Sequence, residues 1–346
     1  MGDTRTADFL LAKNGHAHDL GAYVVDAVFG RGCDGAVCAL ALGDGTLRLV
    51  STIAGEGAWA SVAAHGGACL ALVPDSAGGF LTGGDDGRLV HIGADSAVQE
   101  VARYGTRWVE HVATHESGLR AASVGKALHL LDGAGKPLKS LAHPSAVGGI
   151  AFDAKGKRVA ASHYGGASLW FVGAKEDKPR QLEWKGSHGA IAISPDGTHV
   201  VTAMQENALH GWRLADGQHM RMSGYPSKTR SLGFTAKGRW LASSGAESVV
   251  IWPFFGGGPM GKAPTELAGG DGVLCSMVAC HPLHEVVAAG FGDGLVLLAE
   301  IGSGRVVPVA APGRGAVSAL AWNATGTHLV FGTETGFAGI VDLSKR

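Results

Sequence analysis

Apolar and polar residues alternate along the chain in short segments separated by tight-turn residues, which is the pattern of antiparallel β-strands. In ALGDGTLRLV (41–50), two alternating segments flank Gly43-Asp44-Gly45. Asp-Gly between such segments is a strong hairpin signal, because a two-residue turn that matches strand twist needs residues that tolerate positive φ. This segment therefore predicts a β-hairpin.

The same hairpin recurs along the chain. TGGDDGRLVHI (82–92) and GFGDGLVLL (290–298) repeat it around Asp-Gly, and weaker copies keep the geometry without the Asp. The turns fall near residues 44, 86, 125, 165, 207, 247, 293 and 335. Another apolar strand and turn precede each hairpin, as in GAIAISPDGTHV. Units of roughly 40–45 residues with several strands each are typical of β-propeller blades.

The repeated unit resembles the WD40 family at several motif positions. SPDG (194–197) and His281-Pro282 fit its first blade turn, and the Asp-Gly pairs fit its second. Its opening Gly-His and its strand-ending Trp correspond to Gly15-His16, His143, Trp170, Trp212 and Trp252. The chain departs from the family because no Trp is followed by Asp, and few units hold all residues of the family's Asp-His-Ser/Thr-Trp hydrogen-bond network.

Three-strand units start near residues 24, 67, 109, 147, 188, 229, 275 and 317. The last unit ends at Leu343 without an outer strand, which the N-terminal FLLAK (9–13) is expected to supply, removing an exposed sheet edge. We therefore predict one all-β domain over residues 1–346, an eight-bladed WD40-like β-propeller in which the N-terminal strand pairs with the last blade. Seven blades is the fallback, if the degenerate third unit is not a blade.

Composition narrows the class of protein. The 346 residues include 56 Gly, and 46% are hydrophobic, which suits a folded, turn-rich chain. The net charge of −1 gives no general attraction to nucleic acid or anionic lipid. The chain has neither a long apolar run nor a signal-peptide pattern, so we expect no membrane association. Five cysteines without C-x-x-C fit a reducing cytoplasm.

Motifs of catalysis and cofactor binding are missing from the sequence. It contains no G-x-S-x-G, H-E-x-x-H or G-x-x-x-x-G-K-[ST], so we expect no enzyme activity and no cofactor. Cys33, in the turn RGCDG, is a candidate exposed thiol without an evident base nearby. A propeller lyase or hydrolase is the third-ranked alternative, and it would need a His with a carboxylate or Tyr in one pocket.

The repeat pattern places six of the 16 histidines on one rim, the top face of the propeller: His16, His18, His65, His143, His163 and His188. Most are expected to form hydrogen bonds within their own blades. The alternative is a metal- or small-molecule-binding propeller that uses channel-facing histidines, with His16-x-His18 as a possible pair of Zn²⁺ ligands.

The WD40 resemblance implies a non-catalytic scaffold that recognises a protein or peptide partner. By that resemblance, the contacts lie on the top face, at His65, Arg107, His163, Tyr164, Gln205, Lys228, Arg230, Phe291 and Glu334. Arg107, Tyr164 and Phe291 are the strongest candidates, because Arg and aromatic anchors dominate interface energies.

Overall fold

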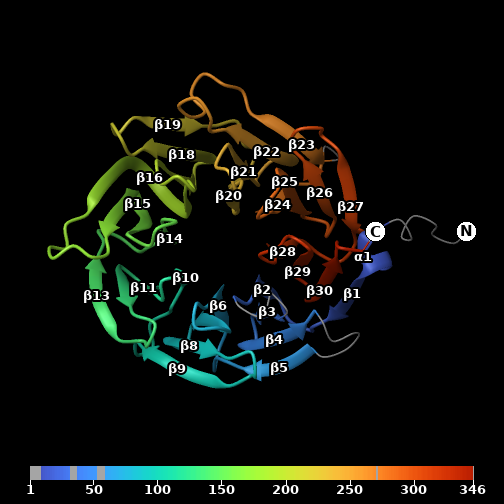
Figure 1. Ribbon diagram of the computed structural model, residues 1–346, viewed down its shortest axis with the longest axis horizontal. Helices are drawn as coiled ribbons and strands as arrows, with labels where there is room; N and C mark the ends of the chain where they lie inside the picture. Colours follow the sequence, from blue (N-terminus) through green and yellow to red (C-terminus); the bar gives the residue numbers. More distant parts are fainter. Residues whose placement is uncertain (1–8, 32–36, 53–58, 270–271, 346) are drawn as a thin grey trace, which may run out of the picture.

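The computed structural model describes residues 9–31, 37–52, 59–269 and 272–345. Within these ranges, the regular structure consists of antiparallel β-strands and one short helix, α1 (Leu10–Asn14). The strands form hydrogen-bonded sheets that stand side by side around a central opening, so the fold is a β-propeller (Figure 1).

Among the described residues there are seven sheets, six with four strands and one with six. The first three sheets along the chain are β2 (Val24–Phe29), β3 (Val37–Leu42), β4 (Thr46–Ser51) and β5 (Trp59–Ala63); β6 (Cys69–Pro74), β7 (Phe80–Gly84), β8 (Arg88–Ile92) and β9 (Val98–Arg103); and β10 (His111–Thr114), β11 (Arg120–Val124), β12 (Ala127–Leu131) and β13 (Pro137–Ala142). In each of these sheets the strands follow one another in sequence order.

The last three sheets are β20 (Leu232–Phe234), β21 (Trp240–Ser243), β22 (Ser248–Pro253) and β23 (Thr265–Gly269); β24 (Cys275–Cys280), β25 (Val286–Phe291), β26 (Val296–Glu300) and β27 (Val306–Ala310); and β28 (Val317–Trp322), β29 (His328–Thr333), β30 (Phe337–Asp342) and β1 (Gly15–Asp19). The last sheet therefore combines the two ends of the chain, with β1 antiparallel to β30.

The six-stranded sheet lies between these two groups. It holds β14 (Gly149–Phe152), β15 (Arg158–Phe171), β16 (Arg180–Ile193), β17 (His199–Met204), β18 (Ala208–Arg213) and β19 (His219–Met222). β15 folds back at Gly165, where φ is +92°, so that Val172 N donates to Lys157 O over 3.0 Å. Its first half pairs with β14 and its second half with the start of β16, whose end pairs with β17.

This sheet corrects the predicted number of blades. The units that start near 147 and 188 are both folded, but they share one sheet because β16 continues without a break from one unit into the next. The described chain therefore has seven sheets instead of eight separate ones. The third unit, whose absence would have explained seven blades, is present: β10–β13 form a complete four-stranded sheet.

The predicted closing strand at residues 9–13 is wrong. Residues Leu10–Asn14 form α1, and the five residues that follow it, β1, take the outer place beside β30. Leu10 and Leu11 pack against the hydrophobic cluster around Val309 and Val341, and a helical turn lets both neighbouring side chains reach that cluster. The outer strand is therefore GHAHD, a polar segment that suits a solvent-facing edge.

The hairpin turns predicted from Asp-Gly are confirmed. β3 and β4 join through Asp44-Gly45, and β7 and β8 join through Asp86-Gly87. Gly45 has φ +83°, and a Cβ there would lie 2.0 Å from the carbonyl oxygen of Gly67, in the loop that leads to the next sheet. Glycine at this turn is thus required both by its conformation and by the close approach of a neighbouring sheet.

The core lies between neighbouring sheets. In the cluster that joins the first and last sheets, Val24, Leu40 and Phe29 pack against Val330 and Ala338. Phe80, Phe291 and Phe331 are the largest fully buried side chains. Burial of Phe291 corrects its prediction as a contact residue. β25 includes the first two residues of GFGDG, Gly290 and Phe291, and the Phe291 side chain packs with Cys275 and Val249.

Candidate partner-binding face and central channel

One face of the propeller carries the hairpin turns near residues 44, 86, 125, 165, 207, 247, 293 and 335, together with the loops that lead into each inner strand. We call it the top face. Contacts between these segments show that they share one side: Tyr164 N donates to Ser145 Oγ over 2.8 Å, and Gly43 N donates to Tyr23 O over 2.9 Å. Ser145 precedes β14 and Tyr23 precedes β2.

Six of the nine predicted contact residues are exposed on this face: Arg107, Tyr164, Gln205, Lys228, Arg230 and Glu334. Two of them meet, since Arg230 Nη1 lies 3.5 Å from Glu334 Oε1. They come from the loop before β20 and from the turn between β29 and β30, and the sheet β24–β27 lies between those two in the ring (Figure 1). The other exposed residues are spread around the face.

His65 and His163 lie inside their sheets instead, with 8% and 4% exposure. His65 Nδ1 is 3.0 Å from Asp86 Oδ1, and its Nε2 is 3.3 Å from Thr82 Oγ1. His163 Nε2 is 2.9 Å from Ser168 Oγ. Burial lowers the pKa of His65, partly opposed by Asp86. Both histidines use their ring nitrogens to fix a loop or turn to a strand, so neither is a surface contact.

Related hydrogen bonds occur at three further positions. Trp170 Nε1 donates to His143 Nε2 over 3.2 Å, and His188 Nδ1 lies 2.7 Å from Thr202 Oγ1. In the sheet β20–β23, Trp252 Nε1 donates to the Tyr225 hydroxyl over 2.7 Å, and that hydroxyl is 2.6 Å from Ser243 Oγ. Tyr225 thus takes the place that His65 has in the sheet β6–β9.

Two exposed aromatic residues were missed from the sequence. Trp108, 57% exposed, follows Arg107 in the loop before β10, and Tyr23, 43% exposed, ends the loop before β2. With Tyr164, which is 66% exposed, they place three aromatic side chains on top-face loops of three different sheets. The signal available was their position: each directly precedes a buried valine, Val24 or Val109, where the chain enters an inner strand.

The histidine pair His16-x-His18 lies on β1, at the outer edge of the ring and away from the channel (Figure 1). The ring of His18 stacks on Trp59 at 5.6 Å. Within the described part of the chain, no group of three or more His, Cys, Asp or Glu side chains is arranged to hold a metal ion. No described helix is long and apolar enough to cross a membrane.

Four cysteines pack inside sheets. Cys38, Cys69 and Cys275 are buried and Cys280 is partly buried, and all four are free thiols. Burial raises the pKa of Cys275 and Cys280 to about 12, so these thiols stay protonated and unreactive at neutral pH. Cys33 lies outside the described residues.

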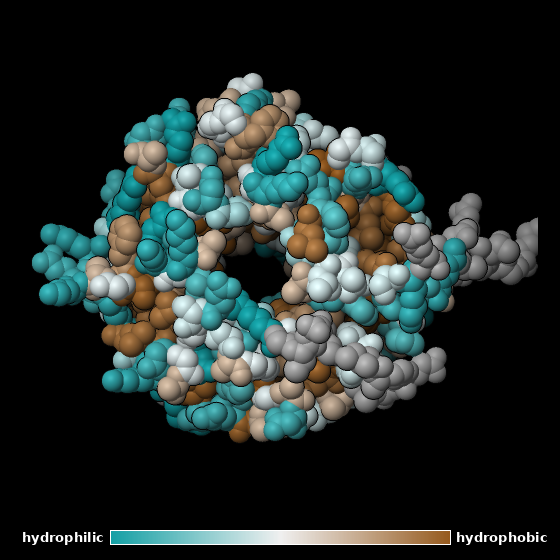
Figure 2. All heavy atoms as spheres, in the orientation of Figure 1, coloured by the Kyte–Doolittle hydropathy of each residue, from teal (hydrophilic) through white to brown (hydrophobic). Residues whose placement is uncertain are grey.

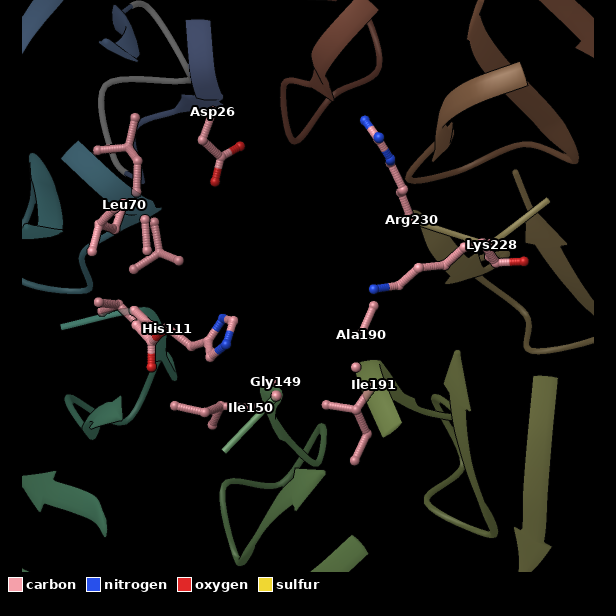
Figure 3. A pocket seen from close by; sticks show the side chains of 17 residues that line it. Asp26, Leu70, His111, Gly149, Ile150, Ala190, Ile191, Lys228 and Arg230 are labelled. Atoms are coloured by element: carbon pink, nitrogen blue, oxygen red, sulfur yellow. The ribbon is translucent and has the colours of Figure 1, made fainter. Parts of the chain in front are cut away.

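A channel runs through the centre of the molecule (Figure 2). Residues of five inner strands and of the loop before β20 enclose a cavity of about 600 Å³ in it. Its wall includes Asp26, Leu70, Leu72, His111, Ile150, Ala190, Ile191, Lys228 and Arg230. The side chains of Asp26, His111 and Lys228 extend into this space from different sides (Figure 3).

Asp26 is the most perturbed carboxyl group in the channel. Its Oδ1 accepts a hydrogen bond from Ala27 N over 2.8 Å. Burial raises the pKa of Asp26 to about 7, against the opposing effect of backbone hydrogen bonds from Ala27 and Leu72. Burial likewise lowers the pKa of His111. Burial in the channel therefore favours the uncharged forms of Asp26 and His111.

Comparison with known proteins supports the fold alone. No protein-family model matches the chain, and no curated protein sequence matches it. The crystal structure of the computationally designed Ika8 protein is similar, with a TM-score of 0.76 and 17% sequence identity over 94% of this chain and 98% of that one. Since 1830 chains of solved structures match, the likeness identifies a β-propeller and leaves its function to be argued from its surface.

Proposed function

We propose that this protein is a non-catalytic scaffold that holds a protein or peptide partner on its top face. The observation that carries the proposal is the exposure of Tyr23, Trp108 and Tyr164 on loops of three sheets at the same face. Tyr and Trp side chains are enriched among the residues that contribute most to the binding energy of protein interfaces.

Charged residues lie near these aromatic anchors. Arg107 precedes Trp108 in the same loop. Lys228 and Arg230 line the channel, and Arg230 forms an ion pair with Glu334. Such charges around aromatic anchors give a partner its orientation. Hydrogen bonds fix two of the anchor-bearing segments, since Tyr164 N donates to Ser145 Oγ and Tyr23 O accepts from Gly43 N. These two anchors are therefore preorganised, and little conformational entropy is lost there when a partner binds.

The repeat units also support a WD40-like family assignment. We infer a WD40-like ring of eight repeat units, two of which share the six-stranded sheet. The described residues form eight hydrophobic clusters, one between each pair of consecutive units. The hydrogen bonds of His65, Thr82 and Asp86, and of Ser243 and Trp252 around Tyr225, are partial versions of that family's network. Free cysteines suit a cytoplasmic location for such a scaffold.

The test is capture of a partner from the native lysate, with Arg107→Ala/Trp108→Ala/Tyr164→Ala beside the wild type. Phe291, the third of the strongest sequence-derived candidates, is left unchanged because it is buried. The matched control for the triple variant is Phe171→Ala/Met260→Ala/Leu283→Ala, which removes three exposed apolar side chains from the turns and loops at the opposite ends of the strands. Circular dichroism confirms that both variants are folded.

We expect the wild type and the control to retain the same partner. The affinity of the top-face variant for that partner should fall roughly 10-fold or more, because interface anchors contribute about 1–2 kcal/mol or more each. A partner retained equally by the top-face variant, or lost only by the control, would overturn the assignment of this face. Cross-linking to Lys228 then locates the contact.

A further inference from the structure

The central channel holds an acidic and a basic side chain that the protein itself does not pair. Asp26 on β2 and Lys228 in the loop before β20 point into the same cavity from different sides (Figure 3). Within the described residues, neither side chain belongs to an ion pair, whereas Arg230 beside them pairs with Glu334. A carboxyl group and an ammonium group are therefore available to a ligand.

The wall between these two groups carries several aliphatic side chains as well as His111. Leu70, Ile150 and Ile191 are partly exposed and line the cavity, and Ala190 leaves room beside them. The cavity volume of about 600 Å³ is within the range of small-molecule sites, which are mostly apolar with a few placed polar groups. The channel thus combines an anion-binding group, an aliphatic surface and a cation-binding group.

A ligand that matches this order has a carboxylate, an aliphatic stem and a cationic end. We propose that the channel binds an amino acid with a cationic side chain, either free or at the C-terminus of a peptide, with its carboxylate at Lys228 and its cation at Asp26. The aliphatic stem packs on Ile150 and Ile191. Lys228 belongs to this site and to the proposed partner-binding face, whereas Asp26, Ile150 and Ile191 belong to the channel alone. Binding of a small ligand here therefore does not need the exposed aromatic residues of that face.

The surroundings of Asp26 predict that ligand binding is accompanied by release of a proton. The adjacent inner strands, β6 and β28, carry no Asp, Glu, His, Lys or Arg. The charged and titratable groups that line the same cavity are Glu110, His111, Lys228 and Arg230. Because burial raises the pKa of Asp26 to about 7, a ligand cation beside it ionises the carboxyl group, and a proton is released on binding.

The experiment is isothermal titration calorimetry of the full chain with four probes. L-Arginine and acetyl-Gly-Gly-Arg with a free C-terminus have both charges. Agmatine and the C-terminal amide of the same peptide lack the carboxylate. Titrations at pH 7 in two buffers of different ionisation enthalpy measure the protons released.

We expect saturable binding of L-arginine or of the free-acid peptide, and at least 10-fold weaker binding of the two probes without a carboxylate. The tighter of the first two identifies the source of the ligand. Asp26→Asn and Lys228→Gln are each expected to weaken binding at least 10-fold, and Asp26→Asn to abolish proton release. Glu116→Gln and Lys126→Gln, which alter exposed residues away from the channel, are the matched controls.

Absence of saturable binding for all four probes would overturn the proposal. Equal binding of agmatine and L-arginine would refute the role of Lys228, and unchanged affinity in Asp26→Asn would refute the role of Asp26. Thermal melting of each variant distinguishes weaker binding from a loss of fold. If Asp26→Asn is unstable, the Lys228→Gln variant still tests the proposal.

Discussion

In the sheet β6–β9, the loop before the inner strand is held by His65, whereas in the sheet β20–β23 Tyr225 holds the equivalent loop. His65 contacts Asp86 and Thr82, and Tyr225 contacts Ser243 and Trp252. Both anchors join a loop to the second strand of their own sheet. They differ in chemistry, because burial lowers the pKa of His65 and raises that of Tyr225 to about 12.

The contrast extends to the opposite ends of these strands. Asp75, after β6, is fully buried, and its Oδ2 lies 2.6 Å from Nη2 of Arg120 in the next sheet. The corresponding turn after β20 carries Thr235, which bonds to the backbone of Trp240. One sheet therefore relies on ionisable groups, and the other on neutral hydroxyl and indole groups. We expect the two sheets to respond differently to mutation and to acid.

The largest effect is expected for Arg120→Leu. It leaves the Asp75 carboxylate buried without its counter-charge, and removal of one partner from a buried ion pair costs about 3–5 kcal/mol of stability. The urea midpoint measures it. Asp75→Asn/Arg120→Leu should recover part of the loss, because it removes the unpaired charge. A loss below about 1 kcal/mol in the single variant would show that Asp75 finds other compensation.

A smaller effect is expected for Tyr225→Phe. It removes the hydroxyl that accepts from Trp252 Nε1 and contacts Ser243, so two buried polar groups lose a partner at a cost of about 1–3 kcal/mol. Urea unfolding and tryptophan fluorescence report the change. Tyr164→Phe, at an exposed position, is the control and should leave the midpoint unchanged. Equal midpoints for both variants would contradict an anchoring role for Tyr225.

The smallest effect is expected for the acid sensitivity contributed by His65. Because its pKa in the folded state is lowered, the unfolded chain binds the proton more readily, so stability is complete above the ordinary histidine pKa of about 6.5 and is lost as the pH falls below it. Urea midpoints between pH 7.5 and 5 should decline less in His65→Gln than in the wild type.

Tyr225→Phe should leave the slope of that decline unchanged, since the Tyr225 hydroxyl does not titrate in this range. His143 and His210, whose pKa burial lowers to about 4 and about 3, keep most of the acid sensitivity in His65→Gln. An identical slope in the wild type and His65→Gln would show that the contact with Asp86 offsets the burial of His65.

The strands and their turns could be predicted from the sequence because they depend on local chemistry. Alternation of apolar residues, as in β3, and Asp-Gly at the turns act within a few residues. The same reasoning found exposed turn residues such as Tyr164 and Gln205. It misassigned Phe291 and His65, because a side chain at the end of a strand points either to solvent or between sheets, and only the neighbouring sheet decides which.

The sequence by itself therefore determined the repeated antiparallel unit and the positions of its hairpins. Tertiary structure decided the union of two units through β16, the replacement of the expected strand at residues 9–13 by β1, and the burial of Phe291. It also decided the channel, which brings Asp26, His111 and Lys228 to one cavity from separate parts of the chain. The physical reason is that hairpins form between neighbours in sequence, whereas a core or cavity between sheets depends on closing the whole ring.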